Sequence, residues 1–324
     1  MGYRYNFKDV LDRSERITWR VEDLIGGGKT LDFAKPFMPE NLARVQALDF
    51  LTAGEKRTLN HVRGHAYLSI FGLVEEFILP FVLDHARPYI NGEDYRARAF
   101  LEFAGEEAKH IHLFRRFKEE FAKGFHVECK VIGPADAVAK HILSHHPLSV
   151  ALTILHIEWM SQRHFQESIH DDGTLDPQFK SLLKHHWMEE LQHAQLDTLM
   201  VETIAEGMSQ QQIDEAVDGY LAIGGFLDDG LKQQTAFDLE AFEAASGRGL
   251  TPAERNRFMT EQHQANRWTY LGTGMTHKNF LETLGNLSPP KRKRLGEVTP
   301  HLPYSVAETL SVYWPSGSWL PLAS

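Results

Sequence analysis

The sequence predicts an all-α protein organised around a four-helix bundle. No long run of alternating apolar and polar residues, as a half-buried strand would require, stands out along the chain. Four long segments instead show helical patterns, and each of them places glutamate or histidine among apolar residues. The composition does not change between the two halves, so we expect a single domain over residues 1–324.

The bundle is assigned to residues 51–207. Thr52 and Glu55 fit a capping box, which opens a first helix that continues to about residue 86. Further helical patterns cover 93–123, 147–169 and 177–206, with a short helical piece at 135–144. Residues 1–50 contain three consecutive glycines and two prolines, and they predict an arm of short helical pieces wrapped around the body.

Accessory helices are expected at 208–286. Ser209 can cap a helix that continues to about residue 245, and Thr251 with Glu254 forms a second capping box for a helix to about residue 284. Six prolines are spread over residues 287–324, which predicts an irregular C-terminal tail. The predicted protein is therefore a bundle elaborated by extra helices.

Charge and cysteine content exclude several classes of function. The net charge of −10 argues against a nucleic-acid-binding protein, which usually needs a basic face. The N-terminus lacks an apolar signal core, and Cys129 is the single cysteine, so we expect a cytoplasmic protein without a disulfide. The most apolar stretch, 67–83, contains two adjacent glutamates, which argues against a membrane span.

The segment 185–193 contains the most informative motif of the chain. On a helix, His186, Glu190 and His193 fall within about 60° of one another, because residues at i, i+4 and i+7 share a face. A second Glu-x-x-His pair is formed by Glu107 and His110. Each pair places a carboxylate and an imidazole one turn apart, where both can bind one metal ion.

Two further helices supply glutamates within apolar runs. Glu158 lies in the segment 152–160, and Glu75 and Glu76 lie in the segment 69–79. One glutamate from each of two helices, with Glu-x-x-His from each of two others, is the ligand set of carboxylate-bridged dimetal sites in bundles. A single Glu-x-x-His is usually a solvated pair, but two such pairs together with buried glutamates indicate a metal centre, since four uncompensated buried carboxylates would be prohibitive.

The ligand on the first helix is either Glu75 or Glu76. Glu75 shares its face with large apolar residues such as Phe71 and Ile78, a pattern typical of plain core. Glu76 shares its face with Ser69 and Gly72, where small side chains would leave room for metal and substrate. We therefore favour Glu76 and expect Glu75 to lie next to the ligands or at an interface.

These residues resemble the ligands of the ferritin-like diiron oxygenases, and the additional histidine resembles the p-aminobenzoate N-oxygenase family. The resemblance covers residues 55–205 and depends on the candidate ligands Glu76, Glu107, His110, Glu158, His186, Glu190 and His193. It implies two iron ions, with manganese as the other metal that suits carboxylate and imidazole ligands. It also implies activation of O2 and oxidation of a small organic substrate, an arylamine in that family.

His186 raises a geometric question. On a regular helix it lies about 10 Å along the axis from His193, and its side chain leans toward the N-terminus. A π-bulge near Met188 would bring His186 to the metal ions. If the helix is regular, we expect His186 to lie outside the ligand set, which would weaken the likeness to the N-oxygenases.

Two alternative functions share the same ligand spacing. One is a diiron enzyme that oxidises carbon, and the other is a non-catalytic ferritin-like protein that handles iron or peroxide. The residues that follow the bundle favour an enzyme, because enclosing a substrate needs additional structure. No flavin or nicotinamide fingerprint is found in the sequence, so electrons would come from a separate donor or reductase. The extra helices are compatible with a homodimer.

Overall fold

The computed structural model describes residues 4–92 and 95–299, and these contain helices and no β-strand. The all-α prediction is confirmed. Short helices form the N-terminal arm: α1 (Phe7–Ser14), α2 (Val21–Leu24), α3 (Glu40–Ala43) and the 3₁₀ turn Val45–Ala47. The bundle helices are α4 (Ala53–Ala86), α5 (Arg96–Gly124), α7 (Pro147–His164) and α8 (Pro177–Ala205), with α6 (Ala135–Leu143) between the second and third.

The C-terminal part adds a second set of helices. Its longest member is α9 (Gln210–Ser246), which is followed by α10 (Pro252–Arg267), a π-helical turn (Trp268–Gly272) and α11 (Thr273–Met275). The chain ends its described part with α12 (Lys278–Leu287) and α13 (Pro289–Val298). Buried hydrophobic side chains from the arm to α13 form one continuous core.

Helix ends follow the sequence signals. Thr52 and Glu55 cap α4 reciprocally, with the Glu55 amide donating to Thr52 Oγ1 at 3.3 Å and the Thr52 amide donating to Glu55 Oε2 at 2.7 Å. Ser209 and Gln212 cap α9 in the same way, and Thr251 and Glu254 cap α10. Each predicted capping box is therefore formed.

The chain beyond residue 267 departs from the prediction. The helix expected to continue to residue 284 is interrupted after α11, where His277 accepts a hydrogen bond from the Asn279 amide and starts α12. Residues 289–298, expected to be irregular, form α13, because Ser288 caps them and two prolines occupy first-turn positions that need no backbone donor. The remaining tail, 300–324, lies outside the described residues.

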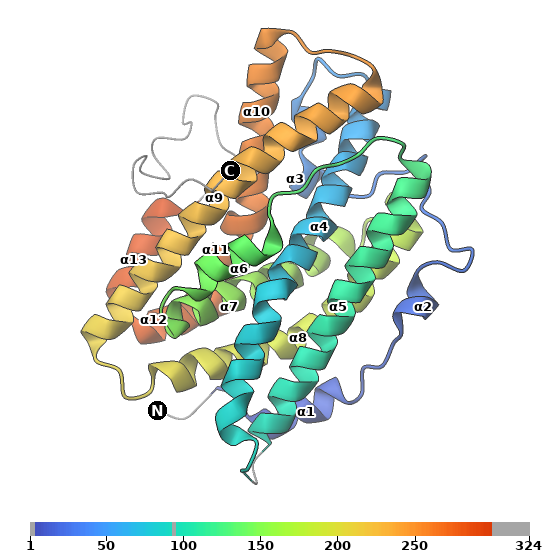
Figure 1. Ribbon diagram of the computed structural model, residues 1–324. Helices are drawn as coiled ribbons and strands as arrows, with labels where there is room; N and C mark the ends of the chain where they lie inside the picture. The colour runs from blue at the N-terminus through green and yellow to red at the C-terminus, as the bar shows by residue number, and fades with distance from the viewer. Residues whose placement is uncertain (1–3, 93–94, 300–324) are drawn as a thin grey trace.

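The four bundle helices are arranged in the order α4, α5, α8, α7. Contacts join α4 to α5, α5 to α8 and α8 to α7, whereas α9 packs on both α7 and α4. Figure 1 shows α9 running diagonally past the bundle, beside α10 and α7. The long helix α9 therefore covers the side on which α4 and α7 make few contacts with each other.

Helix α4 is the central helix of the core. With its 3₁₀ extension, 53–89, it has the length and apolarity of a membrane-crossing helix, but 72% of its most apolar stretch is buried within the protein. Buried residues occur on all sides of α4 because the arm, α5, α6 and α9 all pack against it. An apolar run of this kind is typical of a core helix.

The docking of the arm depends on Gly64 in α4. A Cβ atom at this position would lie 2.9 Å from Phe37 Cβ and 3.4 Å from Phe179. Because both rings are fully buried and stacked 5.0 Å apart, they have little room to move. We predict that Gly64→Ala lowers the free energy of unfolding by about 1–3 kcal/mol, measured by chemical denaturation.

Gly54→Ala is the matched control for this prediction. Gly54 lies in the first turn of the same helix, and apart from its chain neighbours and its own helix backbone no described atom lies within 4 Å of an added methyl group. Alanine should therefore be neutral or slightly stabilising at this position. Equal stability of the two variants would contradict the packing argument.

Candidate metal centre

Carboxylates and imidazoles from all four bundle helices meet in the centre of the protein. Helix α5 supplies Glu107 and His110, and α8 supplies His186, Glu190 and His193. Helix α4 contributes Glu75, and α7 contributes Glu158. Each of these seven side chains is at most 4% exposed.

The side chains form two overlapping groups, each able to hold one metal ion. In one group Glu75, His110, His186 and Glu190 place four ligand atoms within 4.8 Å of one another, and in the other Glu107, His110, Glu190 and His193 do so. His110 and Glu190 belong to both groups. Two metal positions that share a carboxylate define a dimetal centre in a helical bundle, as in ferritin-like proteins.

Glu190 lies at the middle of the cluster. Its Oε1 atom is 2.9 Å from His186 Nε2, 3.3 Å from His110 Nδ1 and 3.7 Å from His193 Nδ1. Glu107 Oε1 lies 3.0 Å from His193 Nδ1. Glu190 is therefore the carboxylate placed to bridge the two positions.

Two further glutamates orient the histidines across the bundle. Glu189 on α8 binds His110 Nε2 at 2.9 Å, and Glu106 on α5 binds His193 Nε2 at 2.7 Å. Each imidazole thereby keeps its Nδ1 atom turned toward the cluster. Such outer carboxylates fix the tautomer and direction of a ligand histidine.

The signal for these two glutamates was present in the sequence. Both motifs read Glu-Glu-x-x-His, with Glu106 and Glu189 each directly before a candidate ligand. Sequence reasoning used only the second glutamate of each pair. On a helix adjacent residues point about 100° apart, so the first glutamate of one motif can reach the histidine of the facing helix.

The N-terminal arm supports the outer carboxylates. Ser14 donates a hydrogen bond of 2.6 Å to Glu106, and Lys109 pairs with Glu189. The Lys109 ammonium lies 4.1 Å from the centre of the Trp19 ring, which in turn stacks on His110 at 6.0 Å. The arm therefore covers the cluster on its α5–α8 side.

The orphaned polar atoms of the cluster show that the residues fit metal ions. These buried atoms have no hydrogen-bond partner among residues 4–92 and 95–299 and belong to candidate ligands: Glu75 Oε2, both Glu107 oxygens, His110 Nδ1, Glu158 Oε2, Glu190 Oε1 and His193 Nδ1. Orphaned buried polar atoms cost free energy and are rare in native proteins. Two cations would satisfy them together.

Protons partly balance the charge in the metal-free protein. Burial alone would lower the pKa of His110, but the nearby carboxylate of Glu107, 3.7 Å away, and the hydrogen bond with Glu189 raise it to about 9. Burial and the neighbouring Glu190 raise the pKa of Glu158 well above its usual value. Metal ions must displace such protons, so metal affinity rises with pH.

The preference for Glu76 is corrected by the structure. Glu76 lies on the outer side of α4, partly exposed, and accepts a bond of 3.2 Å from Arg115. Glu75 is 3% exposed, and its Oε1 is 3.4 Å from His186 Nε2. The small residues beside Glu76 do leave space, but that space faces away from the ligands, toward the segment 131–135.

His186 reaches the cluster without a π-bulge. Helix α8 is α-helical throughout 177–205, and the two π-helical turns of the described chain lie at 165–169 and 268–272. His186 offers its distal Nε2 atom, whereas His110 and His193 turn Nδ1 inward. The longer reach of Nε2 compensates for the displacement along the helix axis.

Asp197 is a buried acid that sequence reasoning missed. It lies four residues after His193 on the same face of α8 and is fully buried. Neither of its carboxylate oxygens has a hydrogen-bond partner within the part of the chain that the structure describes. Burial raises the pKa of Asp197 well above its usual value. The spacing 186, 190, 193, 197 continues one helical stripe, which was the signal available.

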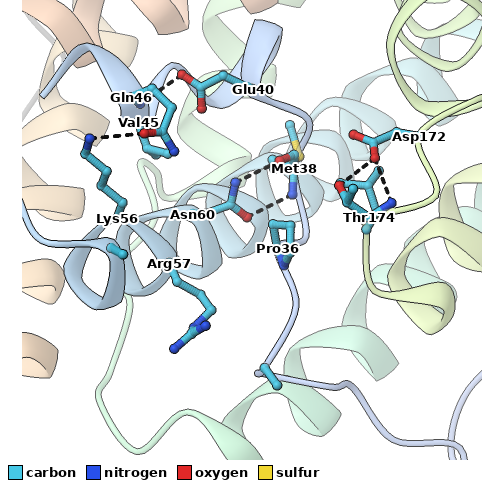
Figure 2. Close-up of a pocket in the computed structure, with 13 residues that line it drawn as sticks. Pro36, Met38, Glu40, Val45, Gln46, Lys56, Arg57, Asn60, Asp172 and Thr174 are labelled. Carbon is cyan, nitrogen blue, oxygen red and sulfur yellow. Dashed lines mark hydrogen bonds between the residues drawn. The ribbon is translucent and has the colours of Figure 1, made fainter. Parts of the chain in front are cut away.

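A surface pocket elsewhere in the protein does not border the metal-ligand cluster. It has a volume of about 430 Å³ and lies between the arm and the start of α4 (Figure 2). Several of its polar groups bond one another: Asn60 bonds both the amide and the carbonyl of Met38, and Lys56 donates to Gln46. This pocket therefore lies where the N-terminal arm packs against the start of α4, and we do not assign it a ligand.

Comparisons with known proteins give distant structural likenesses only. No protein-family model and no curated protein matches the chain. Among solved structures, an R2-like ligand-binding oxidase variant with an anaerobically reconstituted Mn/Fe cofactor is 14% identical, covering 82% of this chain and 94% of that chain with a TM-score of 0.40. Another variant, with an Fe/Fe cofactor, is 13% identical, covering 91% and 94% with a TM-score of 0.42. Because this similarity is low, the assignment of the metal centre depends on the residues of this chain and not on its structural neighbours.

The assignment of Glu75, rather than Glu76, as a metal ligand can be tested directly. We predict that Glu75→Gln reduces tightly bound iron from two ions to about one per chain, because it removes a charged ligand of one position. Glu76→Gln should keep two ions. Iron would be counted after anaerobic loading and desalting, and circular dichroism would check the fold. Loss of iron only in Glu76→Gln would contradict the observed orientation of α4.

Proposed function

We propose that this protein is an O2-activating dimetal oxidase of the ferritin-like class, acting on a small organic substrate. The observation that carries the proposal is the set of buried, unpartnered ligand atoms contributed by four helices. Carboxylate and imidazole ligands without thiolate suit iron and manganese. Two irons are the proposed cofactor, with a Mn/Fe pair as the second choice, the pair found in the distant structural neighbour.

The protein's own residues have separate tasks in this proposal. When bound by these ligands, the metal pair would supply the binding and reduction of O2. Glu106 and Glu189 hold the two imidazoles in the ligating tautomer. The bundle excludes water from the cluster, since the ligands are at most 4% exposed, and a dry site protects reactive oxygen chemistry from side reactions. A separate reductase is proposed as the electron donor.

The finer proposal is N-oxygenation of an arylamine. Its support is His186, which gives the cluster a third histidine on the same helix as Glu190 and His193. Carbon oxidation remains the second candidate, because the ligand set alone does not distinguish the two reactions. Storage of iron is disfavoured by apolar space beside the cluster, which iron ions would not use.

The proposal predicts that the iron-loaded protein oxidises an arylamine, and that this activity requires the metal-binding side chains. The full chain would be loaded with two equivalents of Fe(II), reduced without air, and exposed to ¹⁸O₂ with 4-aminobenzoate. We expect O2 consumption and a product that carries ¹⁸O on nitrogen, detected by mass spectrometry. Glu190→Ala should lose activity by at least about 100-fold, since it removes the shared carboxylate.

Glu119→Ala serves as the control, because Glu119 is exposed on α5 and, among the described residues, forms its ion pair with Arg116. Oxygen consumption without an arylamine product would reject N-oxygenation and retain the oxidase. A chain that binds no iron would contradict the proposed function as a whole.

A further inference from the structure

The connection between α5 and α6, residues 125–134, forms neither a helix nor a strand. Figure 1 shows it leaving the end of α5 and crossing α4 in the view to reach α6. We call residues 125–134 the strap. Ile132 is the one buried residue of the strap, and the other nine are half-buried or exposed. Ile132 is therefore the side chain by which the strap enters the core.

Two cavities of different chemistry lie against Ile132. Among the described residues, the inner cavity is lined by hydrocarbon and thioether side chains and by the Tyr270 phenol. The outer cavity is lined in part by polar and charged groups, among them Glu76 and Lys118, which are both partly exposed to solvent. Because no charged side chain lines the inner cavity, an uncharged apolar molecule is the class of ligand that it accepts.

The wall between the two cavities has one fixed and one movable side. Leu73 and Ile132 line both cavities, so these two side chains separate the inner cavity from the outer one. Leu73 lies in the middle of α4, the central helix of the core, whereas Ile132 belongs to the strap. A displacement of the strap would therefore remove one side of this wall and leave the helices in place.

One side chain of α9 holds the strap at Ile132. Gln234 accepts a hydrogen bond of 3.0 Å from the Ile132 amide and donates one of 3.1 Å to the Lys130 carbonyl. The Lys130 ammonium also pairs with Glu240 at 2.8 Å, but both of these side chains are more than half exposed, and exposed ion pairs contribute little. Gln234 is therefore the principal polar attachment of the strap to α9.

Gln234 itself is held by buried partners on three helices. It is fully buried and donates a further hydrogen bond of 2.8 Å to Asp238, one turn later on α9. Asp238 lies 3.6 Å from Arg63 of α4, and the Arg63 guanidinium donates to Asn266 of α10. Each of these four side chains is at most 2% exposed. The body side of the attachment is thus fixed, so any opening takes place on the strap side.

We propose that the strap is a gate, in which Ile132 closes the inner cavity and Gln234 holds the gate shut. Opening breaks the two hydrogen bonds between Gln234 and the strap, and water can replace both on the strap backbone. The open gate joins the inner cavity to the outer one and admits an uncharged apolar molecule. The gate controls access and needs no bound metal, so the proposal stands independently of the proposed oxidase function.

Thiol labelling tests the gate, because Cys129 is the single cysteine and can be replaced by serine. Val74 lines the inner cavity and Val150 does not, although both are buried in bundle helices. In the Cys129→Ser background, Val74→Cys and Val150→Cys would be labelled with methyl methanethiosulfonate, on the full chain with and without iron. We expect the thiol at position 74 to react at least about tenfold faster, because a local opening needs less free energy than unfolding.

The part played by Gln234 is tested by Gln234→Leu, which removes both hydrogen bonds with the strap. Labelling at position 74 should accelerate by at least about tenfold, and labelling at position 150 should be unchanged. Glu240→Gln is the matched control, because it removes the exposed ion pair between the strap and the same helix, and it should leave both rates unchanged. Ile132→Ala shortens the closing side chain and should accelerate labelling at position 74 with Gln234 in place.

The outcomes decide the proposal in each case. Equal rates at positions 74 and 150 would show that the inner cavity opens only on unfolding and would overturn the gate. An unchanged rate at position 74 in Gln234→Leu, or equal acceleration at both positions, would overturn the role of Gln234. If Gln234→Leu does not fold, the comparison of the two thiols in the chain that retains Gln234 still tests the gate. Iron content is measured separately, so failure of the gate leaves the proposed oxidase unaffected.

Discussion

The structure depends on the compensation of negative charge at its centre. Glu75, Glu107, Glu158 and Glu190 are buried together with three imidazoles, and no lysine or arginine of the described chain reaches them directly. An uncompensated buried carboxylate is one of the most unfavourable groups in a protein interior. Helices that place four such groups in one space are therefore organised for bound cations, and apolar packing around the cluster keeps water out.

A second constraint follows from the way the bundle closes. Three neighbouring pairs of bundle helices pack directly, but α4 and α7 make few contacts and are covered by α9. This arrangement leaves an apolar space lined by Phe71, whose ring packs against the candidate ligand His186. The helices that follow the bundle form one wall of this space, through Leu227, Leu231 and Leu271.

Much of the centre could be predicted from spacing, since His110, Glu107, Glu190 and His193 lie one turn apart in recurring motifs. The choice between Glu75 and Glu76 could not, because α4 is buried on all sides and no polar stripe marks its outer face. The reach of His186 depends on which imidazole nitrogen turns inward, a detail that the sequence does not contain. Contacts of the arm, such as Ser14 with Glu106, join residues 92 positions apart and follow only from the fold.

The most direct test of the account is the position of the metals in a crystal of the iron-loaded protein. Anomalous scattering at the iron edge should give two peaks about 3.5–4 Å apart. One peak should lie between Glu75 and His186, and the other between Glu107 and His193, with Glu190 touching both. A single peak, or iron bound elsewhere while these side chains remain hydrogen-bonded to each other, would contradict the account.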